Sequence, residues 1–162
     1  MICPAAPTSR SNDPRYQSVV FEDDGTYPNN VRLPLVVFQQ VFDAAPAVNP
    51  AIIETAFNQN DWESAWRNGL FAYHHYHSSA HEALGVYSGW VKVQLGGPGG
   101  EAITAHAGDV IIIPAGVAHK NLDQSPDFSV VGAYPRGQSC DMMYGKVGER
   151  PGADQSRASW VR

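Results

Sequence analysis

The feature that most constrains this chain is a set of potential metal ligands in two separate groups. His75, His77 and Glu82 follow one another closely, whereas His119 comes much later. Three imidazoles and one carboxylate suit a single divalent ion. A fold that uses all four must turn back on itself so that the second group meets the first.

Strand geometry makes the first group plausible. Residues two apart on a strand point to the same face, so the rings of His75 and His77 can converge on one ion. Glu82 lies at an odd offset from His77, which on a flat strand would place it on the opposite face. We therefore expect a bend or bulge at Ser78-Ser79-Ala80, because serine tolerates such backbone changes. His81 would then point away from the site, although it remains an alternative to Glu82 as ligand.

The second group follows a short apolar run, Val110-Ile111-Ile112-Ile113, which is β-branched and predicts a buried strand. Pro114 cannot continue a central ladder, so Pro114-Ala115-Gly116 predicts a turn. This turn delivers His119 to the start of the next strand. A sheet that folds back would place His119 opposite His75 and His77.

Both segments resemble the double motif of the cupin superfamily. The first motif matches from Gly69 to Gly89, and the second matches from Gly108 to His119. Asn121 stands two residues after His119, where the motif has its asparagine four residues after, and this weakens any role for Asn121. The resemblance implies an all-β jelly-roll β-barrel, a double-stranded β-helix with the metal inside. It also implies that the metal ligands are His75, His77, Glu82 and His119.

A longer stretch, roughly from Phe21 to Gly145, resembles the small single-domain cupins called YjlB-like. The similarity rests on six short segments: Phe21–Gly25, Pro28–Asn30, Leu33–Pro34, His74–Ser78, Ala80–Glu82 and Val131–Pro135. This family is mostly described as uncharacterised, so the resemblance implies a fold more than a reaction.

Composition excludes several kinds of partner. The net charge is -5 and no basic run is present, which argues against nucleic acid and anionic membranes. No apolar stretch approaches the length of about 18 residues that spans a bilayer. The segment from Met1 to Gln17 lacks the apolar core of a signal peptide, so we expect a cytoplasmic protein. Cys3 and Cys140 are far apart in the sequence and are expected to be unpaired thiols.

The chain is long enough for one domain with a core. We expect a disordered N-terminus at residues 1–15, a single cupin domain at residues 16–145 and a C-terminal tail at residues 146–162, in which Trp160 could pack on a partner. The strand that starts at Leu35 is expected to be an edge strand because Pro34 precedes it. A homodimer is expected, since pairing would cover the apolar residues 35–38.

One short helix is expected before the first motif. Asn49 is a favoured N-cap and Pro50 fits the first helical position. The helix is expected to end near residues 58–60 and to present one apolar face, formed by Ile52, Ile53, Ala56 and Phe57. Trp62 and Trp66 follow at helical spacing and are expected to pack on the barrel, with ligand stacking as the alternative.

Two functions are consistent with these features. The first is a metalloenzyme with one divalent ion (Fe, Mn, Ni or Zn) and a small-molecule ligand, with an oxidoreductase of the dioxygenase type acting on a small organic acid or enol as the expected kind. The alternative is a non-catalytic metal- or ligand-binding domain. Sugar epimerisation without a metal is a weaker third interpretation, because a full set of ligands is present. An open coordination position would favour the enzyme.

Overall fold

The computed structural model describes residues 15–158, so the expected disordered N-terminus, apart from Arg15, and the expected packing of Trp160 lie outside the described residues. The elements are β1 (Tyr16–Phe21), β2 (Asn30–Phe38), α1 (Pro50–Gln59), β3 (Trp62–Asn68), β4 (Glu82–Ser88), β5 (Trp90–Leu95), β6 (Glu101–His106), β7 (Val110–Ile113), β8 (His119–Gln124), β9 (Ser129–Pro135) and α2 (Gly152–Ala158).

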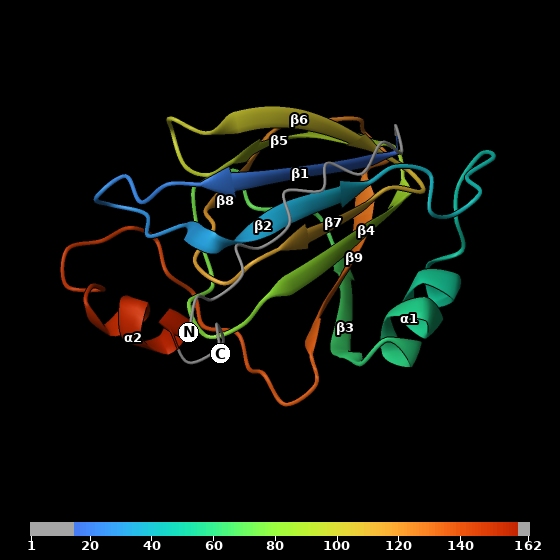
Figure 1. Ribbon diagram of the computed structural model, residues 1–162. Helices are drawn as coiled ribbons and strands as arrows, with labels where there is room; N and C mark the ends of the chain where they lie inside the picture. Colours follow the sequence, from blue (N-terminus) through green and yellow to red (C-terminus); the bar gives the residue numbers. More distant parts are fainter. Residues whose placement is uncertain (1–14, 159–162) are drawn as a thin grey trace, which may run out of the picture.

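The strands form two antiparallel sheets with the orders β1-β2-β7-β4-β9-β3 and β6-β5-β8. In Figure 1 the strands β5 and β6 lie along one side of the molecule, and α1 lies next to β3. This confirms the predicted all-β jelly roll.

The alternation of side chains along β4 separates two apolar clusters. Leu84 and Val86 belong to the larger cluster, between the sheets. Ala83 belongs to the smaller cluster, which α1 covers from outside. Because successive strand residues point to opposite faces, Glu82 lies on the same face as Leu84 and points into the barrel. Gly85 lies under the helix, where an added Cβ would come within 2.6 Å of Cγ2 of Ile53.

The helix α1 begins and ends where the sequence predicts. The side chain of Asn49 accepts a hydrogen bond from the backbone N–H of Ala51, and Pro50 follows the cap. Ile53 and Phe57 are buried against the sheet. The predicted apolar face is too wide, however, because Ile52 is 55% exposed and points to solvent.

The helical spacing of Trp62 and Trp66 has another origin. Both residues lie in β3, which pairs with β9, and the register shifts between Glu63 and Trp66. Ser64 adopts a positive φ of 55° within this interval. On a regular strand residues four apart share a face, but the extra residue of a bulge places Trp66 against the inner cluster and Trp62 against the outer cluster under α1. Both tryptophans therefore pack on the barrel, as expected.

The prediction of an edge strand after Pro34 is wrong. β2 lies between β1 and β7, and among the described strands β1 forms that edge of the sheet. Within β2 only Val36 to Phe38 pair with β7, so Pro34 lies beyond this ladder and removes no hydrogen bond from it. Leu35 and Val37 are buried in the core of one chain. The homodimer stays a prediction, without this segment as its reason.

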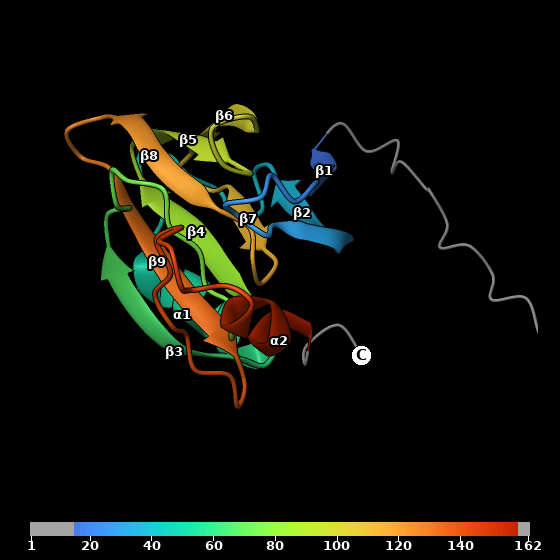
Figure 2. The ribbon, with the colours of Figure 1, turned by 90° about the vertical axis from the view of Figure 1, so that its left-hand side faces the viewer.

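The tail contains a second helix that the sequence reasoning missed. α2 is short, and Arg150 just before it forms ion pairs with Asp23 and Asp154. Figure 2 shows α2 in front of α1 in this view. None of the helices in residues 15–158 is long and apolar enough to cross a membrane.

Replacing Ile53 with Ala should lower the free energy of unfolding by about 2–4 kcal/mol, because it opens a cavity between α1 and the sheet. Ile52→Ala is the matched control on the same helix and should change it by less than about 0.5 kcal/mol. Urea denaturation of both variants measures the difference. Equal losses would contradict the packing of α1 through Ile53.

Candidate metal centre

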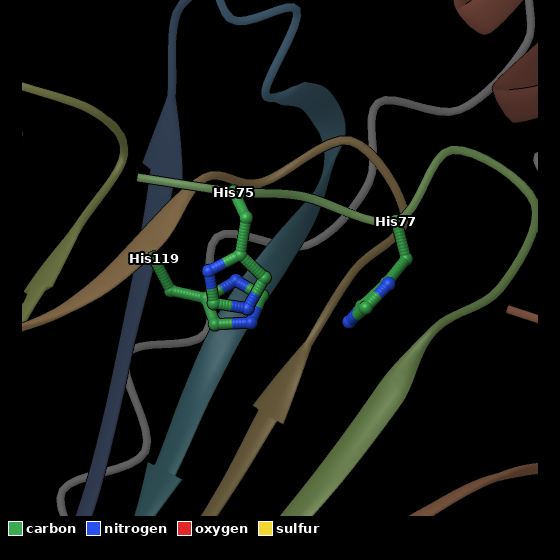
Figure 3. Close-up of side chains that lie close together, drawn as sticks. All are labelled: His75, His77 and His119. Atoms are coloured by element: carbon green, nitrogen blue, oxygen red, sulfur yellow. The ribbon is translucent and has the colours of Figure 1, made fainter. Parts of the chain in front are cut away.

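Three short segments bring the predicted ligands together. His75 forms an isolated antiparallel bridge with His119, which begins β8, and Glu82 begins β4. His77 lies in the loop after this bridge rather than on a regular strand. The turn around Pro114 leads from β7 in one sheet to β8 in the other and returns His119 to the first group, as the sequence predicts. Figure 3 shows the three rings directed into one space.

The expected bend occurs at Ser78 and Ser79, and a residue from far along the chain fixes it. The carboxylate of Asp141 accepts hydrogen bonds from the backbone N–H groups of Ser78 (2.6 Å) and Ser79 (3.2 Å) and from the hydroxyl of Ser78. Burial raises the pKa of Asp141, but these hydrogen bonds outweigh it and lower the pKa below its ordinary value. The bend changes the parity of the chain, so that Glu82 faces the histidines.

The distances between the polar atoms fit a common ion. One ring nitrogen from each of His75, His77 and His119 lies within 4.8 Å of the others. Oε2 of Glu82 lies 3.1 Å from Nε2 of His119 and 3.4 Å from Nε2 of His77. Two ligand atoms each about 2.1 Å from an ion lie about 3.0 Å apart at an octahedral angle and about 3.4 Å apart at a tetrahedral one.

Backbone carbonyls fix the tautomers of all three rings. Nδ1 of His75 lies 3.0 Å from the carbonyl of Tyr73, Nδ1 of His77 lies 2.6 Å from that of Asp141, and Nδ1 of His119 lies 3.1 Å from that of Val117. A carbonyl only accepts, so each Nδ1 carries the proton. In the neutral rings every Nε2 therefore presents a lone pair, which is the form that binds metal.

Two buried atoms at the centre lack a hydrogen-bond partner, namely Nε2 of His119 and Oε2 of Glu82. Although they lie 3.1 Å apart, both present lone pairs when His119 is neutral. A positive charge between them, either a proton or a metal ion, removes this repulsion. The buried group His75, His77 and His119 is thus compatible with a metal ion.

The electrostatics of the site are dominated by burial and by Glu82. Burial lowers the pKa of His75 to about 3, so this ring is neutral at ordinary pH. Burial also lowers the pKa of His77, but the hydrogen bond and charge of Glu82 outweigh it, and the net pKa lies above the ordinary value. Burial raises the pKa of Glu82, yet the neighbouring imidazoles of His119 and His77 bring it well below its ordinary value, because a proton on either ring would be shared with the carboxylate. Glu82 is therefore an anion.

The remaining histidines lie apart from this group. Nδ1 of His81 accepts a hydrogen bond from the backbone of Ala115, so His81 points away as expected and supports the turn before His119. His106 is exposed, and His74 packs against Tyr27. Asn121 is buried but binds the side chain of Gln124, which gives it a structural role.

A cavity of about 400 Å³ adjoins the four residues. Its walls contain three further aromatic side chains, Trp66, Phe71 and Tyr134, together with Leu70 and Met142. Sequence reasoning did not single out Tyr134 or Asp141. Tyr134 lies within a segment that supported the family resemblance, whereas nothing near Asp141 marked it.

Comparison with known proteins agrees with this geometry. The family model described as "Cupin domain" matches residues 67–125, which include His75, His77, Glu82 and His119. The "Uncharacterized protein YjlB" of Bacillus subtilis (strain 168) is 42% identical over 134 residues, which cover 83% of this chain and 78% of that protein. With this similarity and the jelly-roll fold, the chain belongs to the cupin family and is a relative of the YjlB protein.

Proposed function

We propose that this protein binds one divalent metal ion and acts on a small molecule held beside it. The ligands would be Nε2 of His75, His77 and His119 and a carboxylate oxygen of Glu82. The observation that carries the proposal is the buried pair of Glu82 Oε2 and His119 Nε2, which lie 3.1 Å apart and have no hydrogen atom between them when the imidazole is neutral. Burying such a carboxylate without positive charge would be strongly unfavourable.

The donor set supports a first-row transition ion. Imidazole suits Fe, Ni and Zn, and carboxylate suits Mn as well, so all four predicted metals remain candidates. The ring orientations are set before any ion arrives, because the carbonyls of Tyr73, Asp141 and Val117 hold the Nδ1 protons. Preorganisation of this kind strengthens metal binding.

The cavity supports a reactive rather than a purely structural ion. A structural site is closed by protein ligands, whereas a catalytic site keeps one position open. Here the four residues form part of the wall of a cavity of about 400 Å³, which a small ligand could fill. When bound, a divalent ion would polarise an oxygen atom of that ligand or, if redox-active, exchange an electron with it.

Tyr134 is placed to assist in the cavity. Its hydroxyl accepts a hydrogen bond from Nε1 of Trp66 (3.0 Å), and Cys140 is a second hydrogen-bonding neighbour of the same hydroxyl. Burial first, then the charge of Glu82 and the neighbouring Cys140, raise the pKa of Tyr134 above its ordinary value. The phenol therefore keeps its proton and can donate it in a hydrogen bond to a ligand.

The double substitution His75→Ala/His77→Ala should abolish metal retention, because it removes two of the four donors. The purified protein is expected to carry about one ion per chain, measured by elemental analysis. His106→Ala is the control, since His106 is exposed and should leave the metal content unchanged. Unchanged metal content in the double variant would overturn the proposed ligands.

Replacing Asp141 with Ala should weaken metal binding about 10–100-fold, because the bend at Ser78 and Ser79, which places His77 and Glu82, loses its hydrogen-bond acceptor. Competition with a coloured chelator measures the affinity. Asp123→Ala, an exposed carboxylate on β8, should have no effect. An Asp141 variant with full affinity would show that the bend holds without this carboxylate.

Metal occupancy should fall as the pH drops, and protonation of His77 should start this loss. Proton and metal compete for Nε2, and the raised pKa of His77 makes the proton compete from above the ordinary value of 6.5. His75, with its pKa lowered to about 3, becomes protonated only in stronger acid. Elemental analysis after equilibration at a series of pH values measures the curve. Occupancy that stays flat down to about pH 4 would exclude histidine ligation.

A further inference from the structure

Beside the candidate ligands, the wall of the cavity is mainly aromatic and apolar. Trp66, Leu70, Phe71, Tyr134 and Met142 face the same space as the histidines. Among the described residues that line the cavity, Arg67 is the single lysine or arginine, and its guanidinium binds both carboxylate oxygens of Glu54 at 2.6 and 3.0 Å. A ligand with a second carboxylate would therefore find no free cation on this wall.

The residues Trp66, Leu70, Phe71, Tyr134 and Met142 are called the aromatic wall, and contacts between strands hold its rings in place. An added Cβ on Gly132 would come within 2.1 Å of the indole of Trp66, so this ring occupies the place of the missing side chain. The indole N–H donates to the hydroxyl of Tyr134, which holds both rings in one orientation. The ring of Tyr134 also meets His77 edge-on, with centroids 5.9 Å apart. Trp66 thus presents a fixed ring surface beside the candidate metal.

The aromatic surface continues from the cavity to the exterior. Phe71 is 50% exposed and Tyr73 is 44% exposed, and their rings stack at 5.0 Å with 15° between the planes. Both meet the ring of His75 at 5.2 and 5.8 Å. Exposed aromatic side chains that cluster at the mouth of a cavity are typical of a ligand-binding surface.

We infer that the substrate class of this site is a planar aromatic compound with an oxygen donor, such as a phenol, catechol or aryl enol, rather than an aliphatic acid. Its oxygen would face His75, His77 and His119, its ring would contact Trp66 and Phe71, and the hydroxyl of Tyr134 would donate a hydrogen bond to it. This inference rests on the proposed function and narrows it. Of the two expected substrate classes, small organic acids and enols, this inference keeps the enols and excludes the aliphatic acids.

Two hydroxamates test the inference, because they share the same metal-binding group and differ in the attached body. Benzohydroxamate carries a phenyl ring and acetohydroxamate carries a methyl group. Calorimetric titration of the metal-loaded protein should show benzohydroxamate binding at least about tenfold tighter, since the ring buries more apolar surface. The metal content of each sample is measured in parallel.

Single substitutions test which side chains cause the preference for benzohydroxamate. Phe71→Ala should remove most of the preference for benzohydroxamate while leaving metal content and acetohydroxamate affinity unchanged. Phe38→Ala, which alters another exposed phenylalanine on β2, is the matched control and should preserve the preference. Tyr134→Phe should weaken both hydroxamates to a similar extent, because it removes the donor to their shared group.

The outcomes separate the two proposals. Protein that holds no metal would overturn the proposed function and this inference with it. Protein that holds metal but binds the two hydroxamates equally, or prefers acetohydroxamate, would overturn the inference alone. A preference that survives Phe71→Ala, or that is lost in Phe38→Ala, would overturn the assignment of the preference to the aromatic wall.

Discussion

The buried carboxylate of Glu82 is the constraint on which the candidate site depends. An anion in the interior is unfavourable unless positive charge and hydrogen bonds surround it. The structure places Nε2 of His77 and His119 within 3.4 Å and 3.1 Å of it. Without a metal, a proton held mainly by His77 can neutralise the group, as its raised pKa indicates. The site is therefore arranged to hold a cation, and a proton is the natural competitor of the metal.

The same strand links the site to the stability of the fold. On β4 the residues alternate between the barrel interior, where Glu82 and Leu84 lie, and the outer face, where Gly85 contacts Ile53 of α1. β9 follows the same pattern, with Val130 in the inner cluster and Val131 against the helix. The helix thus fixes the outer faces of the two strands whose inner faces carry Glu82 and Tyr134, and packing outside the barrel holds the geometry inside it.

Much of this site could be predicted because its determinants are local. The parity argument from His77 to Glu82 required a bend at Ser78 and Ser79, and the structure has one. What fixes that bend could not be predicted, since Asp141 lies more than sixty residues away and its role depends on tertiary contact. Trp62 and Trp66 pack on the barrel as expected, but their helical spacing did not reveal that they lie in a strand. The bulge at Ser64 that places them on opposite faces of β3 depends on the pairing of β3 with β9.

The position of Asp141 in the chain has a consequence for the order in which the protein matures. All four candidate ligands and every strand of the barrel precede it, because β9 ends at Pro135. During synthesis the N-terminal part emerges first. A nascent chain that has reached Pro135 thus contains the barrel and its imidazoles but lacks the carboxylate that holds Ser78 and the carbonyl that orients His77. Firm metal retention would then distinguish chains that have been made past Asp141 from those that have not.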